Sequence, residues 1–195
     1  MKPWDYHPDL TQDRLIVVGS LIAQARKSVF ELYDERGDDS WSLGCRGFAW
    51  CRNAIIRLAD SDNYPWLSVI DRSRRFIFRI GKVPIRFFRG DADEPFQKTL
   101  ASASFEGEQY ALKFPGENPG LNLIWRFVVE TDFDGDFAKV FFNGATRNGI
   151  PECVWEVPLF EEDLKDLEDE AAVAPEEELP EPIVRLPGID DAANE

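Results

Sequence analysis

The residues best suited to chemistry in this sequence are basic side chains that cluster in one short stretch. Residues 72–89 carry no acidic residue and seven basic ones: Arg72, Arg74, Arg75, Arg79, Lys82, Arg86 and Arg89. Arginine grips phosphate or carboxylate groups through charge-assisted hydrogen bonds, and a neighbouring aromatic ring offers a surface on which a nucleobase can stack. We predict a surface for a polyanion, formed by Arg75, Arg79, Arg86 and Phe88. The alternative is a solvated sheet face on which arginine stems cover apolar surface.

The last part of the chain carries most of the negative charge. Residues 161–195 contain 14 Asp or Glu and two basic residues, a net charge of −12, whereas the first 160 residues have a net charge of −3. Such a tail can occupy a basic surface of its own chain or of a partner protein, and its one apolar stretch can order on contact. The tail residues that we expect to bind a partner are Glu176, Glu177, Glu178, Ile183, Val184 and Leu186. A tail that only keeps the protein in solution is the alternative.

Candidates for catalysis or metal binding are few. His7 is the only histidine, so imidazole acid–base catalysis has a single candidate close to the N-terminus. Residues 132–136 alternate acids as a calcium-binding loop does, but the Gly and Glu required further along that loop are missing. The three cysteines lack the paired spacing of a zinc site and are expected to be reduced thiols. We therefore expect no cofactor and no metal, and carboxylates in the loops remain the only basis for a nuclease or hydrolase.

Composition predicts a folded protein outside the membrane. Hydrophobic residues make up 44% of the chain and aromatic residues 13%, which is ample for a packed core. No apolar run has the length needed to cross a bilayer, and the first residues lack the pattern of a signal peptide. We expect a cytoplasmic protein.

Two helices are predicted ahead of the basic stretch. Over residues 10–36 apolar side chains recur at three- and four-residue steps, which places them on one face of a helix. Asp9 or Thr11 can cap its start and Gly37 can end it. A second amphipathic helix is expected over residues 40–60, and the short link favours an antiparallel pair.

After Pro65 the hydrophobic period changes to two, which indicates strands. Residues 74–89 predict a hairpin around a type II′ turn at Gly81-Lys82. That turn pairs apolar residues across the hairpin: Ile80 with Val83, Phe78 with Ile85, and Phe76 with Phe87. The same register sends the three arginines, with Ile77 and Phe88, to the opposite face.

A three-stranded meander is predicted over residues 122–158. Asp134-Gly135 and Asn148-Gly149 are type I′ turn signals, and each sets a register independently of the other. Both registers give one continuous apolar face, which consists of Phe127, Val129, Val140, Phe142, Trp155 and Val157.

Together these patterns predict an α+β domain over residues 1–160, followed by the acidic tail over residues 161–195. The domain would be an antiparallel helix pair packed on an antiparallel sheet of about five strands. We expect a non-catalytic regulatory protein whose tail engages a basic protein partner or masks its own hairpin. The first alternative is a module that binds single-stranded nucleic acid through the hairpin, and the second is a carboxylate-dependent nuclease or hydrolase.

Overall fold

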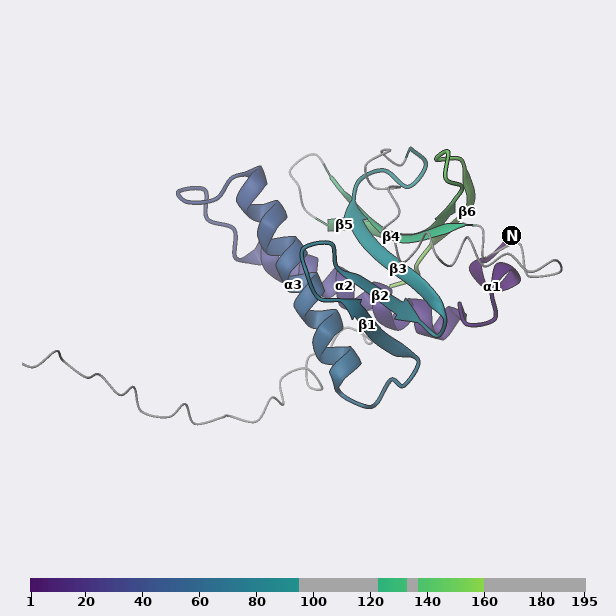
Figure 1. The fold of residues 1–195 in the computed structure, drawn as a ribbon. Coiled ribbons are helices and arrows are strands. Elements are labelled where there is room, and N and C mark those ends of the chain that lie inside the picture. Colours follow the sequence, from purple (N-terminus) through teal and green to yellow (C-terminus); the bar gives the residue numbers. More distant parts are fainter. Residues whose placement is uncertain (95–122, 133–136, 160–195) are drawn as a thin grey trace, which may run out of the picture.

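The structure, a computed structural model, describes residues 1–94, 123–132 and 137–159 (Figure 1). Its helices are α1 (Pro3–Tyr6), α2 (Gln12–Glu31) and α3 (Ser40–Asp60). Its strands are β1 (Leu67–Asp71), β2 (Ile77–Ile80), β3 (Val83–Arg89), β4 (Ile124–Thr131), β5 (Phe137–Ala145) and β6 (Pro151–Glu156). The α+β prediction is confirmed. None of the described helices is both long enough and apolar enough to pass through a membrane.

The two long helices form where the apolar period predicts them. Helix α3 has the predicted bounds, because Asp39 caps it by accepting hydrogen bonds from the backbone N–H groups of Trp41 and Ser42 at 3.0 and 2.8 Å. Helix α2 starts after Thr11 and ends at Glu31, several residues before the predicted end at Gly37. The two helices pack against each other, and α2 also contacts β5 while α3 contacts β1. They thus bury the apolar side of the sheet.

The sheet differs from the prediction in strand number and in direction. Six strands lie in the order β1-β2-β3-β4-β5-β6. The sequence predicted about five strands, and β1 was not among them. Strands β3 and β4 run parallel, with Phe87 beside Phe127, whereas every other neighbouring pair is antiparallel. The sheet is therefore mixed, and the expectation of a wholly antiparallel sheet is wrong. A parallel pair needs a long crossover, and residues 90–123 separate these two strands.

The hairpin has the predicted register. Phe78 pairs with Ile85 and Ile80 pairs with Val83 across β2 and β3. Gly81 adopts a φ of +57°, the left-handed conformation that this turn requires of its first residue. Asp9 closes the turn rather than capping α2, because its carboxylate accepts a hydrogen bond from the backbone N–H of Lys82 at 2.9 Å.

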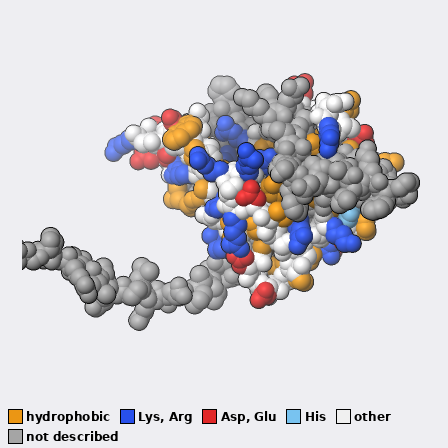
Figure 2. All heavy atoms as spheres, viewed as in Figure 1, with side chains coloured by type: hydrophobic (Ala, Val, Ile, Leu, Met, Phe, Trp, Pro, Cys, Tyr) orange, Lys and Arg blue, Asp and Glu red, His pale blue; other side chains and the backbone are white. Residues whose placement is uncertain are grey.

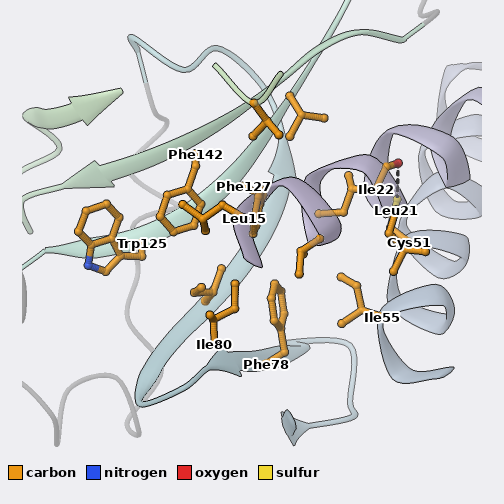
Figure 3. Close-up of a cluster of buried hydrophobic side chains, with 14 of the residues drawn as sticks. Leu15, Leu21, Ile22, Cys51, Ile55, Phe78, Ile80, Trp125, Phe127 and Phe142 are labelled. Carbon is orange, nitrogen blue, oxygen red and sulfur yellow. Dashed lines mark hydrogen bonds between the residues drawn. The ribbon is translucent and has the colours of Figure 1, made fainter. Parts of the chain in front are cut away.

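The meander also has the predicted register. Phe127 pairs with Phe142, Val129 with Val140, and Phe142 with Trp155. The apolar face formed by these strands is buried, with the following exposed fractions: Phe127 0%, Val129 2%, Val140 0%, Phe142 0%, Trp155 7% and Val157 2%. In Figure 3 the ring of Phe142 lies beside Trp125 and close to Phe127 and Leu15. The ring centroids of Phe142 and Trp125 are 5.2 Å apart, and those of Phe142 and Phe127 are 4.8 Å apart.

Part of the opposite sheet face is buried as well. Val128 and Arg126 are buried there, although they alternate with the core residues of β4. The segment that follows β3 covers some of this face, since Ala92 donates its N–H to Glu130 at 3.0 Å and its carbonyl accepts from the Asn143 amide. Both faces of β4 are thus largely removed from solvent, whereas β6 exposes Glu152, Val154 and Glu156 on its outer face.

Candidate functional site

The three predicted arginines lie on the hairpin and on the turn that leads into it. Arg79 is on β2 and Arg86 on β3, while Arg75 precedes β2 in the turn after β1. Arg75 and Arg79 are exposed, and Arg86 is half-buried. The Arg79 Nε donates a hydrogen bond to the Ser68 hydroxyl at 2.7 Å, which holds its guanidinium over β1. Neither Arg75 nor Arg79 forms an ion pair with a carboxylate of the described residues.

One acidic side chain lies close to this arginine surface. Hydrogen bonds from Ser73 lower the pKa of Asp71 below its ordinary value, and the charges of Arg75 and Arg86 lower it further. Asp71 is therefore ionised at neutral pH, and it lies within electrostatic reach of both arginines. The basic stretch contains no acid in sequence, but the fold places one beside it and so reduces the positive potential at that point.

Other basic side chains extend the positive surface toward α3. Figure 2 shows Lys and Arg side chains spread over the face that carries α3 and the hairpin, with acidic side chains between some of them. Some of these arginines serve the fold: Arg72 pairs with Asp60 at 2.6 Å, and Arg52 donates to the Arg72 carbonyl at 3.1 Å. Arg75 and Arg79 are both exposed and therefore accessible to an external polyanion.

Phe88 follows Arg86 by two residues on β3, so the alternation of the strand puts both side chains on the same face of the sheet. Its side chain is half-buried and also lines a cavity between the helices and the ends of β3 and β4. Ile77, expected on the arginine face, is 2% exposed. The apolar side chains predicted beside the arginines are therefore less exposed than Arg75 and Arg79.

The tail residues of the prediction lie outside the described residues. These are Glu176, Glu177, Glu178, Ile183, Val184 and Leu186. Their part in binding stays a prediction from charge and sequence.

The cavity beside Phe88 is a site that the sequence patterns did not single out. Its volume is about 130 Å³. On the helix side its walls are Arg26 of α2 with Gly44, Gly47, Phe48 and Cys51 of α3. On the sheet side they are Phe87, Phe88, Arg89 and Val129. Two guanidinium groups and three phenyl rings thus line one cavity, and none of the acidic side chains in the described part of the chain does.

Arg26 is the unusual member of this cavity. It is 7% exposed, its Nε has no hydrogen-bond partner, and it pairs with no carboxylate of the described residues. Burial lowers the pKa of Arg26 below its ordinary value; the nearby Cys51 raises it and the positive charge of Arg89 lowers it further. A buried charge is normally paired, because losing hydration without an opposite charge costs several kcal/mol.

Two glycines inside α3 make room for this arrangement. A Cβ atom on Gly47 would lie 2.7 Å from the Arg26 Cζ, so the guanidinium packs directly on the glycine backbone. A Cβ atom on Gly44 would meet no atom of the described residues within 4 Å, so space is open beside this part of the cavity wall. The sequence held a signal for this site: Arg26 falls on the apolar stripe of α2, four residues after Ile22 and three before Val29.

The remaining candidates for chemistry serve the packing. The Cys51 thiol donates a hydrogen bond to the Ile22 carbonyl at 3.7 Å (Figure 3), and burial raises its pKa to about 12. His7 is 8% exposed, and its Nδ1 accepts the N–H of Asp9 at 3.1 Å, while burial lowers its pKa. Within the described ranges, no three His, Cys, Asp or Glu side chains gather where they could hold a metal ion.

Comparison with known proteins gives no assignment. The chain matches no protein-family model, and neither the curated proteins nor the solved structures include a significant match to it.

Proposed function

We propose that the protein is a non-catalytic regulatory protein whose acidic segment, residues 161–195, binds basic surfaces. One such surface is its own arginine surface, formed by Arg75, Arg79 and Arg86, and the other belongs to a partner protein. The observation that carries the proposal is the exposure of Arg75 and Arg79 without a described carboxylate partner, in a chain whose last segment has a net charge of −12. Opposite charges joined by one chain attract each other at any protein concentration.

The strength of the internal contact suits a reversible switch. Each exposed ion pair contributes about 0–1 kcal/mol, and salt screens it. Tethering holds the tail at an effective concentration on the order of millimolar, so a few such pairs suffice to keep it on the hairpin. A partner with a more extended basic surface then displaces the internal contact, and that exchange is the regulatory step.

The test is limited proteolysis of the full chain across a salt series. We expect cleavage within residues 161–195 to accelerate as the salt concentration rises, because the internal contact is electrostatic. The double substitution Arg75→Ser and Arg79→Ser should give fast cleavage already at low salt. The matched control is Arg57→Ser, which removes an exposed arginine that belongs to α3 and not to the hairpin.

Three outcomes separate the alternatives. Cleavage that responds neither to salt nor to the double substitution refutes the internal contact and leaves a solubilising tail. Cleavage that responds equally to Arg57→Ser shows a diffuse charge effect and refutes the hairpin as its target. Salt-sensitive binding of a single-stranded oligonucleotide, lost on the double substitution while tail cleavage stays unchanged, shows a nucleic-acid-binding module instead.

A further inference from the structure

We propose that the cavity between α2, α3 and the ends of β3 and β4 binds a small organic carboxylate. Its carboxylate group pairs with Arg26, and its apolar body lies among Phe48, Phe87 and Phe88. The cavity and the predicted surface formed by Arg75, Arg79, Arg86 and Phe88 have only Phe88 in common. This proposal therefore stands independently of the function proposed for the tail.

The buried guanidinium is the first argument. Arg26 is 7% exposed, and its Nε has no partner. An arginine in this position destabilises the fold unless an anion compensates it, since an unpaired buried charge costs several kcal/mol. Arg89, the second guanidinium of the cavity, has an exposed side chain and adds positive charge at the cavity wall. The cavity thus has an excess of positive charge and a place for one anionic group.

The two glycines of α3 are the second argument. Glycine inside a helix destabilises the helix relative to alanine, so it is expected there mainly where a side chain would interfere. At Gly47 the interference is with the Arg26 guanidinium itself. At Gly44, which also lines the cavity, a Cβ atom would meet no atom of the described residues within 4 Å. The absence of a side chain at position 44 therefore keeps this part of the cavity wall low.

The size and the lining of the cavity define the class of ligand. A volume of about 130 Å³ is close to the roughly 150 Å³ of an apolar cavity that admits benzene. The planar fork of a guanidinium matches the two oxygens of a carboxylate. Phe48 and Phe87 have ring centroids 5.4 Å apart and form an apolar wall against which a ring can pack. A compact monocarboxylate with a ring-sized apolar body fits these features better than a strongly hydrated inorganic anion.

Binding is measured on the full-length protein with benzoate as the probe. In a titration followed by two-dimensional NMR, we expect saturable shifts of the Gly44 and Gly47 amide signals. Benzamide has nearly the same shape without the charge, and we expect it to bind at least about tenfold more weakly, which corresponds to about 1.4 kcal/mol. Inorganic phosphate tests the anion without the apolar body and should leave these signals unchanged at equal concentration.

Two substitutions test the two halves of the site. Arg26→Met removes the charge at similar side-chain length and should lower benzoate affinity at least about tenfold. Gly44→Leu places a good helix former in the cavity wall and should abolish binding while the melting temperature is kept or raised. Arg57→Met, an exposed change at the far end of α3, is the control and should leave the affinity unchanged.

Several results would overturn the proposal. Absence of saturable shifts with benzoate refutes a carboxylate site. Equal affinity of the wild type and Arg26→Met shows that the guanidinium does not recognise the anion. Shifts with phosphate but none with benzoate show a site for an inorganic anion, which contradicts the ligand class.

Discussion

Replacing Arg26 by methionine should make the ligand-free protein more stable. The substitution removes a guanidinium that is 7% exposed and unpaired among the described residues, and it keeps an unbranched side chain that can pack on Gly47 and Cys51. Replacing buried charges by apolar residues of similar volume stabilises proteins by about 1–4 kcal/mol in favourable cases. Because the substitution removes one buried charge rather than a pair or a triad, we expect the lower half of that range, about 1–2 kcal/mol.

The measurement is urea unfolding at neutral pH, followed by tryptophan fluorescence. The midpoint should rise at an unchanged denaturant slope, since the surface exposed on unfolding is nearly the same. In a thermal melt each kcal/mol corresponds to about 2–4 °C for a protein of this size. Arg57→Met removes an exposed arginine from the same helix pair and should change the free energy of unfolding by no more than about 0.5 kcal/mol.

A loss of stability would refute the reasoning. If Arg26→Met lowered the free energy of unfolding by more than about 1 kcal/mol, the guanidinium would have to be paired in solution. The expected gain also has a functional meaning. A residue that destabilises the free protein is typical of a binding site, because residues chosen for binding often make the protein less stable than other residues at the same positions would.

Two further predictions concern the core and its thiols. Phe142→Ala should lower the free energy of unfolding by about 3–5 kcal/mol, because Phe142 is 0% exposed and stacks on Trp125. Phe141→Ala, on the half-buried opposite face of β5, should lower it by less than half as much. Equal losses for the two variants would contradict the assignment of these residues to opposite faces. Burial raises the pKa of Cys51 from 9.0 to about 12, so the folded state keeps a proton that the unfolded state releases, and stability falls as the pH rises through this interval. In urea unfolding from about pH 8.5 to 10.5, the free energy of unfolding should fall less steeply with pH for Cys51→Ala than for the wild type. Cys45→Ala, which removes an exposed thiol, is the control. Identical slopes for the two variants would contradict the burial of Cys51.

The local parts of the fold could be predicted because their information lies within a few residues. Gly81-Lys82 and Asn148-Gly149 set registers in which apolar residues face apolar residues, and the structure has those registers. The bounds of α3 follow from its cap at Asp39 and its apolar stripe. In such segments turn chemistry, period and capping all act between near neighbours, and they agree with one another.

The candidate sites could be predicted only in part. The exposed Arg75 and Arg79 were expected from charge and alternation, since a hairpin of known register fixes which side chains leave the core. That Phe88 also lines a cavity was not foreseen, because it depends on how α2 and α3 lie over the end of β3. The burial of Arg26 depends on the same packing.

The tertiary structure alone decided how the locally predicted pieces join. Neither the parallel contact of β3 with β4 nor the addition of β1 to the hairpin follows from any period, because a strand shows its faces in sequence but not its neighbours. The cavity is of the same kind. Arg26 and Gly47 belong to different helices, and only the packing of α2 on α3 places a guanidinium against a bare stretch of backbone. Such contacts form between residues that are distant in sequence, and the local sequence pattern around one residue does not indicate which other residue it will contact. Their geometry is set by the close packing of the whole core.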